Sequence, residues 1–338
     1  MDVKTTLSAL VAKRDLTRDE MRAVMRSIMQ GEWTPAQIAG TLIGLRCKGE
    51  SIDEIAACAD VMRELSTKVP VSDKEHLVDT CGTGGDSSHT FNISTASAIV
   101  AAAAGVKIAK HGGRSVSSTC GSADVLEALG VNVNLSPEQV AGCVAEVGVG
   151  FMFAPNYHSA MKHAAPVRRE LGIRTLFNVL GPLTNPAGAC NQVLGVFDRA
   201  LVGKLAHVLQ TLGSRHVMVV HGADGMDEIS IGGPTFVAEL KNGAIREFEI
   251  EPAQFGFRVS TNDSIKVSNI DDAKVMLLAV LHNTAGSARD IVCLNAGAAI
   301  YVGARAASLE EGISLASAAL ESGAAQKTLD RLIEFSQR

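Results

Sequence analysis

Two short motifs contain residue types that could bind a polyphosphate. Residues 82–86 read GTGGD and directly follow a short apolar stretch. Three glycines in four residues let the backbone come close to a bulky ligand and turn N–H groups toward an anion, although a plain tight turn would use them too. Residues 92–96 read NISTA, where Ser94 or Thr95 can cap a helix whose first N–H groups are free to bind phosphate. Because the motifs begin ten residues apart, one shared ligand is favoured over an unrelated turn and helix cap.

A third motif adds positive charge. Residues 110–118 read KHGGRSVSS, and the polar segment continues to Gly121 and Ser122. Lysine and arginine supply charge, whereas serine hydroxyls and loop N–H groups supply directed hydrogen bonds to phosphate oxygens. A solvated flexible loop would have the same composition. The glycine-rich motif is not a Rossmann fingerprint, because position 87 is serine, and it is not a P-loop, because no GK[ST] follows it at the required spacing.

A fourth motif, at residues 224–228, reads DGMDE and supplies adjacent carboxylates. In a loop, Asp227 and Glu228 can bind a hard cation jointly, and Mg²⁺ typically takes one or two carboxylates together with substrate phosphates and water. Acids in an exposed turn are the alternative for this motif taken alone. The chain shows no HExxH zinc motif and no nucleophile triad. The four motifs together therefore indicate electrostatic handling and positioning of a polyphosphate.

Helix signals in the first 70 residues predict a small all-helical domain. Capping boxes stand at residues 17–20, 34–37 and 51–54, and each precedes apolar residues at helical spacing. We therefore assign residues 1–70 to this domain. The segment 159–188, which begins as a helix rich in lysine, histidine and arginine, is predicted to return to it.

From residue 76 onward, short apolar strands alternate with helices. This pattern is typical of a large α/β domain with a mostly parallel central sheet, which we assign to residues 76–158 and 189–338. The predicted strands are 77–79, 106–109, 131–135, 149–154, 192–197 and 216–221, and the predicted helices include 94–104 and 123–129. Loops at the carboxyl ends of parallel strands bind ligands, so the motifs that follow strands are expected at one sheet edge.

Composition narrows the function classes further. The chain has 338 residues, is 46% apolar and carries a formal net charge of −5. Net acidity argues against general nucleic-acid binding, which needs a basic face. The richest apolar stretch, residues 96–106, is only about half as long as a membrane span. The seven cysteines are scattered without a CxxC pair, as in reduced cytoplasmic proteins. We therefore expect a cytoplasmic protein that binds neither nucleic acid nor membranes.

The chain resembles the anthranilate phosphoribosyltransferases over essentially its whole length. The motifs that carry the resemblance are GTGGD at 82–86, NIST at 92–95, KHGGRSVSS at 110–118, GSADVLEALG at 121–130, VRRELGIRTLFNVLGPLTNP at 167–186 and DGMDEIS at 224–230, with support from KGES at 48–51. Several long motifs in the right order make chance similarity negligible.

The resemblance implies an architecture and a reaction. The architecture is a small helical domain and a large α/β domain with the active site at the hinge, in a homodimer built through the helical domains. The implied substrates are small molecules, 5-phosphoribosyl 1-pyrophosphate and anthranilate. The implied products are N-(5-phosphoribosyl)anthranilate and pyrophosphate, in a step of tryptophan biosynthesis. The implied cofactor is Mg²⁺, with two ions per active site.

The resemblance also implies roles for individual residues, carried over position by position. It assigns no general acid or base, and instead an electrostatic role to Lys110, Asp227 and Glu228. The residues implied for phosphoribosyl pyrophosphate are Gly82, Gly84, Gly85, Asp86, Thr90, Asn92, Ile93, Ser94, Thr95, Lys110, His111, Gly112, Gly113, Arg114, Ser115, Val116, Ser117, Ser118 and Ser122. The residues implied for anthranilate are Gly82, His111, Gly113, His158, Arg168 and Pro182, with Arg168 meeting the carboxylate. The implied metal ligands are Ser94, Asp227 and Glu228.

The chain departs from the family pattern at two positions. The family loop usually reads KHGNR, but position 113 here is glycine, so the asparagine side chain that normally contacts anthranilate is missing. This leaves two outcomes open: reduced activity, or replacement of the contact by another group or by water. The usual HPAMK segment has Ser159 in place of proline, which matters little because serine can cap a helix.

Three other functions are alternatives. A pyrimidine nucleoside phosphorylase shares the architecture and an anion-binding loop, but it would use phosphate and a nucleoside without Mg²⁺, whereas NIST and the pair Asp227 and Glu228 favour the transferase. A paralogue that has lost anthranilate specificity and binds nucleic acid is disfavoured by the acidic balance and by Arg168. A non-catalytic partner subunit is disfavoured by the intact set of phosphate and metal residues.

Overall fold

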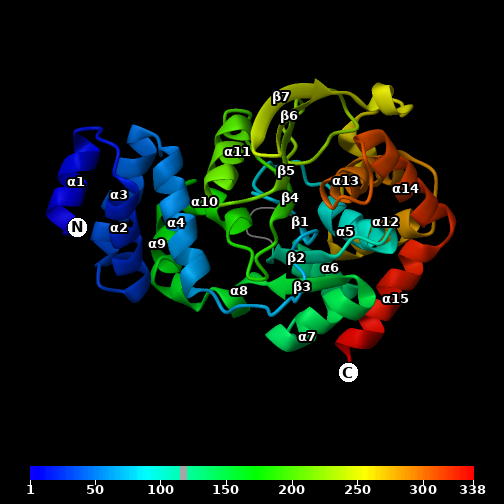
Figure 1. Ribbon diagram of the computed structural model, residues 1–338, viewed down its shortest axis with the longest axis horizontal. Coiled ribbons are helices and arrows are strands. Elements are labelled where there is room, and N and C mark those ends of the chain that lie inside the picture. Colours follow the sequence, from blue (N-terminus) through cyan, green and yellow to red (C-terminus); the bar gives the residue numbers. More distant parts are fainter. Residues whose placement is uncertain (115–119) are drawn as a thin grey trace.

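A central sheet of mostly parallel strands organises the larger part of the molecule (Figure 1). The structure is a computed structural model that describes residues 1–114 and 120–338. Over this described part the sheet has seven strands in the order β3-β2-β1-β4-β5-β6-β7. The parallel strands are β1 (Val78–Gly82), β2 (Ile108–Gly112), β3 (Val149–Phe153), β4 (Asn191–Gly195) and β5 (His216–Gly222). An antiparallel hairpin of β6 (Thr235–Lys241) and β7 (Ala244–Ile250) completes it at the β5 side.

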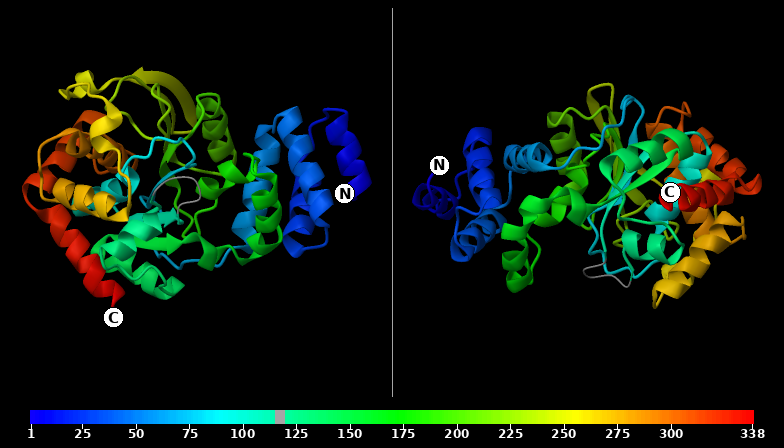
Figure 2. Two further views of the ribbon diagram at one scale, coloured as in Figure 1. Left: turned by 180° about the vertical axis from the view of Figure 1, so that it is seen from behind. Right: turned by 90° about the horizontal axis from the view of Figure 1, so that it is seen from below.

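The N-terminal helices form a separate bundle at one end of the molecule, as the prediction of an all-helical part requires (Figures 1 and 2). They are α1 (Val3–Val11), α2 (Arg18–Gln30), α3 (Pro35–Lys48) and α4 (Ile52–Leu65). The capping boxes predicted at residues 17–20, 34–37 and 51–54 are all present and start α2, α3 and α4. Helix α1 was not predicted, and the Asp2 carboxylate caps it by accepting from the Thr5 N–H at 2.9 Å.

The remaining helices pack on the two faces of the sheet or join its strands. They are α5 (Ile93–Ala103), α6 (Ser122–Ala128), α7 (Pro137–Gly142), α8 (Ala154–Tyr157), α9 (Ala165–Leu171), α10 (Phe177–Leu180), α11 (Leu201–Thr211), α12 (Ile270–Leu281), α13 (Ser287–Val302), α14 (Leu309–Glu321) and α15 (Ala324–Ser336). A π-helical turn, η1 (Cys143–Val147), follows α7, and four 3₁₀ turns are η2 (Ser159–His163), η3 (Gly181–Leu183), η4 (Pro252–Phe255) and η5 (Asn262–Ile265). The elements η2 and α9 pack against α2 and α3, so this segment lies beside the N-terminal bundle.

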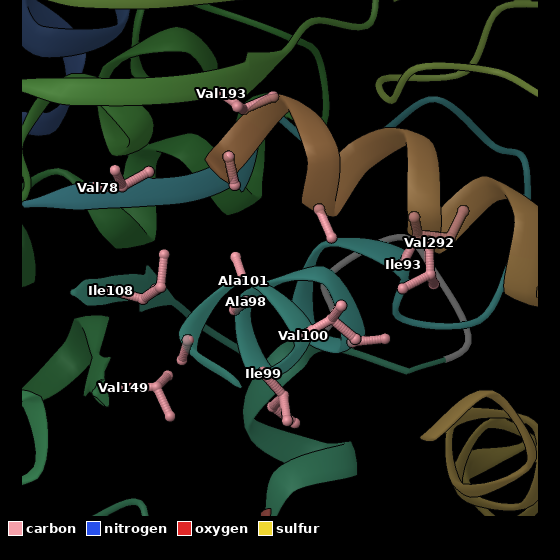
Figure 3. Close-up of a cluster of buried hydrophobic side chains, with 14 of the residues drawn as sticks. Val78, Ile93, Ala98, Ile99, Val100, Ala101, Ile108, Val149, Val193 and Val292 are labelled. Atoms are coloured by element: carbon pink, nitrogen blue, oxygen red, sulfur yellow. The ribbon is translucent and has the colours of Figure 1, made fainter. Parts of the chain in front are cut away.

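Two hydrophobic cores lie on opposite faces of the sheet. In β5, Val217 and Val219 belong to the core shared with α11 and the N-terminal bundle, whereas Met218 and Val220 belong to the core shared with α5 and α13. This division follows from the alternation of side chains along a strand. Figure 3 shows part of the second core, with labelled side chains of the strands, such as Val78 and Ile108, of α5, such as Ala98 and Ala101, and Val292 of α13. The sheet is therefore covered on both faces, as is usual for parallel strands.

One predicted strand is wrong. Residues 131–135 alternate between buried and less buried positions, as a strand would, but they form no strand. Their backbone lies beside the C-terminal helix instead: the Asn132 N–H donates to the Ser336 hydroxyl at 3.0 Å, and the Gln337 side chain donates to the Gly130 carbonyl at 2.9 Å. Side chains of a helix have replaced a neighbouring strand as hydrogen-bond partners, which a local pattern does not reveal. Among the residues described, no helix is both long and apolar enough to cross a bilayer.

Candidate active site

Three of the four motifs stand at the carboxyl ends of parallel strands. The glycine-rich motif follows β1, the basic motif begins in β2, and the acidic motif follows β5. The second motif forms the first turn of α5, the helix that follows β1. Because carboxyl ends of parallel strands share one sheet edge, the fold brings these motifs together. The predicted phosphate contacts Ser115, Val116, Ser117 and Ser118 lie outside the described residues.

The glycine-rich loop and the acidic loop touch each other directly. The Gly84 N–H donates to the Asp227 carboxylate at 2.8 Å, and Gly84 has a φ of 66°, which favours glycine. A Cβ atom at Gly82 would lie 2.3 Å from that carboxylate, and one at Gly195 would lie 1.5 Å from the Asp227 carbonyl oxygen. The approach therefore requires glycine at both positions. Gly195, at the end of β4, was not predicted to contribute, because its role depends only on what packs against it.

Three carboxylates lie close together at this contact. The Asp227 N–H donates to Asp86 at 3.4 Å, and Glu228 follows in sequence. Burial raises the pKa of Asp227 and of Glu228, and the neighbouring carboxylates raise both further, while Lys110 partly offsets the effect at Glu228. Negative charge is thus concentrated in a desolvated place, an environment that a divalent cation would stabilise. Within the described part of the chain, no three histidine, cysteine or acidic side chains converge to enclose a metal ion, so phosphate and water oxygens would have to complete its coordination.

Lys110 lies beneath the glycine-rich loop beside the start of α5. Its side chain is buried, and its ammonium group donates to the Thr80 carbonyl and, at 3.1 Å, to the Ser94 hydroxyl. The predicted cap at Ser94 or Thr95 is wrong, because α5 begins two or three residues earlier, at Ile93, with Asn92 as N-cap and without a side-chain cap bond. The Asn92 amide instead donates to the Cys120 carbonyl at 3.0 Å. The start of α5 therefore has no capping side chain, although the Ile93 N–H donates to the Phe91 carbonyl at 2.8 Å and the Thr95 N–H to the Asn92 carbonyl at 3.1 Å. The positive end of the helix dipole still favours an anion there.

The described part of the basic motif shows one unexpected pairing. Arg114 forms ion pairs with two acids of α6, Asp124 at 2.8 Å and Glu127 at 2.6 Å, and lies over the Phe153 ring. Its charge is thus held at α6 in this structure. A Cβ atom at Gly112 would lie 3.1 Å from Phe151 and 3.3 Å from Ser122, whereas one at Gly113 would meet no atom of the described residues within 4 Å.

The residues predicted for anthranilate lie between the sheet edge and the helical bundle. The rings of His111 and His158 are edge to face with centroids 5.0 Å apart, and the Nε2 atoms of both are buried without a hydrogen-bond partner among the described residues. Burial lowers the pKa of His111 to about 3 and that of His158 to about 4, so both rings are neutral at pH 7. Half-buried Arg168 lies 5.4 Å from the Phe177 ring centroid, and Pro182 is buried.

A shallow hollow lies beside His158. Its other lining residues are apolar and come from α2, α4 and η2: Met29, Met62, Leu65, Ala160 and Met161. Of the other predicted residues, Ser122 begins α6, Ile93 begins α5, and Thr90 pairs with Lys266 in an isolated antiparallel bridge.

Sequence reasoning missed further residues that shape the site. Arg174 donates to the Gly85 carbonyl and lies over the Phe197 ring, while the Phe197 N–H donates to the Thr83 hydroxyl at 3.1 Å. Through these contacts, Arg174 and Phe197 hold the glycine-rich loop in place. Arg174 lies within the motif at 167–186, but nothing in its spacing indicated this contact.

Comparisons with known proteins agree with this arrangement. The helical bundle domain model of a glycosyl transferase family matches residues 4–66, and its a/b domain model matches residues 74–326. The chain is 63% identical over 330 residues to the anthranilate phosphoribosyltransferase of Thiobacillus denitrificans, covering 98% of this chain and 96% of that protein.

Solved structures are similar over the full length as well. The anthranilate phosphoribosyltransferase of Thermus thermophilus superposes with a TM-score of 0.93 at 41% identity, covering 98% of this chain and 99% of that one. The anthranilate phosphoribosyltransferase of Saccharomyces cerevisiae, in complex with PRPP and Mg, has a TM-score of 0.88 at 27% identity and covers 99% and 98% of the two chains.

Proposed function

This chain belongs to the anthranilate phosphoribosyltransferase family, and we propose on that premise that it moves the phosphoribosyl group of 5-phosphoribosyl 1-pyrophosphate onto the amine of anthranilate. The products are N-(5-phosphoribosyl)anthranilate and pyrophosphate, in tryptophan biosynthesis. One observation carries the proposal: buried Lys110, the uncapped start of α5 and the carboxylate of Asp227 meet at the glycine-rich loop. This combination suits a polyphosphate held with a divalent cation.

The phosphate side of the site is proposed to act through charge and oriented N–H groups. The positive end of α5 attracts phosphate oxygens, the hydroxyls of Ser94 and Thr95 bind them, and Lys110 contributes a buried positive charge. The Thr95 hydroxyl is buried without a partner among the described residues, which leaves it able to donate to a ligand. In a site shielded from water, such groups stabilise the charge that develops on departing pyrophosphate.

Mg²⁺ is the proposed cofactor, held by Asp227, Glu228 and Ser94, with two ions per active site. The residues fit the ion because desolvation and the charges of neighbouring carboxylates raise the pKa of both Asp227 and Glu228, and a cation would offset this repulsion. When bound, Mg²⁺ would neutralise charge on the phosphate oxygens. The yeast relative whose structure contains PRPP and Mg supports this choice. Exchange of both Asp227 and Glu228 for alanine should abolish turnover, and near-normal rates in that variant would contradict the assignment.

The acceptor side is proposed to bind and orient anthranilate without a general base. Arg168 binds the carboxylate, and the neutral rings of His111 and His158, with Pro182, contact the aromatic ring. An aromatic amine is neutral at pH 7 and needs no prior deprotonation. As pyrophosphate leaves, the sugar carbon gains oxocarbenium character, and the amine attacks from the opposite face. Positioning and electrostatics therefore carry the reaction.

The wider organisation is also proposed. Residues 1–70 and 159–188 form one domain, and residues 76–158 and 189–338 form the other, with the site at their hinge. A homodimer assembles through the helical domains, and the 85% exposed Val11 of α1 offers apolar surface for it. Light scattering of the wild-type chain and of Val11→Glu tests the dimer. The free thiols of all seven cysteines support a cytoplasmic location, which cell fractionation tests.

The decisive assay follows the loss of anthranilate fluorescence with phosphoribosyl pyrophosphate and Mg²⁺. We expect consumption that needs both substrates and stops when EDTA removes the metal. Thymidine with inorganic phosphate is the parallel reaction for a nucleoside phosphorylase, and a DNA mobility-shift assay examines the nucleic-acid alternative. Cleavage of thymidine without anthranilate consumption would replace the proposal with the phosphorylase function.

A further inference from the structure

The strands β1 and β2 stop pairing just before the candidate site. Register partners between them are limited to Val78 and Ile108, although both strands continue to the sheet edge. By contrast, β1 pairs with β4 at five positions, and β2 pairs with β3 at five. The gap is therefore local to β1 and β2 at their carboxyl ends, where the glycine-rich and basic motifs begin.

Side chains satisfy the backbone groups that the next rungs would have used. In a parallel ladder continuing from Val78 and Ile108, the Ala109 carbonyl would accept from β1, and the His111 N–H would donate to the Thr80 carbonyl. Instead, the Ala109 carbonyl accepts from the Asn185 amide at 2.8 Å, and the His111 N–H donates to the Asp79 carboxylate at 3.1 Å. The Thr80 carbonyl accepts from the Lys110 ammonium group.

Asp79 and Asn185 also bind each other inside this gap. The Asn185 amide donates to the second carboxylate oxygen of Asp79 at 2.8 Å, and the Asn185 side-chain oxygen accepts from the Ala187 N–H at 2.9 Å. Asp79 is 1% exposed and Asn185 is 7% exposed. Every donor and acceptor of the Asn185 amide group is thus engaged in a place closed to water, which gives the pair one geometry.

We propose that Asp79 and Asn185 are positioning residues, which hold β1 and β2 apart at the sheet edge and so place Lys110 and His111 against the two substrates. The inference rests on the proposed function, because it assigns Lys110 to pyrophosphate and His111 to anthranilate. With a regular ladder, the Thr80 carbonyl would bind the His111 N–H and would not be left for the Lys110 ammonium group. Asp79 and Asn185 therefore determine where the Lys110 ammonium group lies.

The same pair connects the phosphate side with the acceptor side. Asn185 lies three residues after Pro182, whose carbonyl accepts from the Gln192 amide at 2.7 Å. Gln192 also donates to the Cys81 sulfur at 3.0 Å, and Cys81 stands two residues after Asp79 in β1. Burial raises the pKa of Asp79, and the charge of nearby Lys110 lowers it. Asp79 and Lys110 thus act as buried groups of opposite charge. A shift of the pair would displace both substrate sides together.

Exchange of the two side chains tests the proposal. In Asp79→Asn, either orientation of the new amide sets an N–H group against the N–H of Asn185 or of His111. In Asn185→Asp, two carboxylates face each other. We expect each single variant to lose about a hundredfold in kcat, because small displacements of positioned groups have effects of that size. In the double variant, the new amide can accept from His111 and donate to the new carboxylate, so we expect it to recover about tenfold relative to the worse single variant.

Asn191→Ala is the matched control. Asn191 is another buried asparagine, which donates to the Glu75 and Leu77 carbonyls at the opposite end of the sheet. We expect it to lower the melting temperature while its kcat stays near the wild-type value. Equal kcat values for Asp79→Asn and Asn191→Ala would overturn the proposal, as would a double variant no more active than the worse single variant.

Two further measurements cover the other outcomes. If the exchange variants fail to fold, Asn185→Ser keeps one small donor and should still lose about tenfold in kcat, and wild-type kcat in that variant would overturn the proposal. If the wild-type chain shows no phosphoribosyl transfer, the proposed function fails, and hydrogen exchange at the His111 amide then tests the geometry alone. That amide should be protected in the wild-type chain and exchange faster in Asp79→Ala, and equal protection would overturn the inference.

Discussion

The substitution Gly113→Asn should strengthen anthranilate binding without straining the loop. A Cβ atom at position 113 meets no atom of residues 1–114 or 120–338 within 4 Å, and the φ of Gly113 lies outside the left-handed region, so a side chain fits this part of the structure. The family resemblance implies that asparagine here contacts anthranilate. One net hydrogen bond contributes about 0.5–1.5 kcal/mol. We therefore expect KM for anthranilate to fall by roughly twofold to tenfold.

Two control variants separate the added contact from effects on the loop. Gly113→Ala also restricts the unfolded chain, which stabilises by about 0.4–1 kcal/mol, but it adds no polar group. Gly112→Ala instead places a Cβ 3.1 Å from Phe151 and 3.3 Å from Ser122, so it should lower the melting temperature. Initial rates of anthranilate consumption at saturating phosphoribosyl pyrophosphate give KM for each variant. A Gly113→Asn variant with the same KM as Gly113→Ala would refute the reasoning.

Three other outcomes are expected. Asp227→Asn keeps an acceptor for the Gly84 N–H but removes the charge, so kcat should fall by about a hundredfold in the fluorescence assay, and wild-type Mg²⁺ dependence in that variant would contradict its role. Lys48→Met leaves the fully buried Glu54 carboxylate without its 2.8 Å partner and should cost about 3–5 kcal/mol in urea unfolding, whereas Arg26→Met breaks an exposed pair and should cost less than about 1 kcal/mol. Burial raises the pKa of Glu239, but hydrogen bonds from three side chains outweigh this effect and lower it to about 2. The stability that the ionised carboxylate contributes to the fold is complete above the ordinary pKa of glutamate and is lost as pH falls toward 2. The free energy of unfolding should thus fall, by on the order of 3 kcal/mol, more steeply with acid in the wild-type chain than in Glu239→Gln, and parallel curves would refute this.

Local signals predicted much of the fold. Each capping box consists of residues three apart in sequence, so its hydrogen bonds form wherever the first turn of a helix forms. The helices α2, α3 and α4 of the bundle were predicted for this reason. The wrong strand at residues 131–135 shows the limit, because the Asn132 N–H finds its partner in Ser336 of α15, 204 residues away in sequence.

The sequence alone determined the chemical types present at the site and the order in which strands present them. The glycines, the cations of the motif at residues 110–118 and the paired acids indicated a polyphosphate with a metal cation before any contact was known. Tertiary structure decided which atoms meet: that Gly195 lets Asp227 approach, that Asn92 is the N-cap of α5, and that Asp79 and Asn185 replace a missing ladder. The physical reason is the distance along the chain over which each interaction acts. Turn geometry and strand alternation depend on neighbours along the chain, whereas close approach and the pairing of buried polar groups depend on segments that only folding brings together.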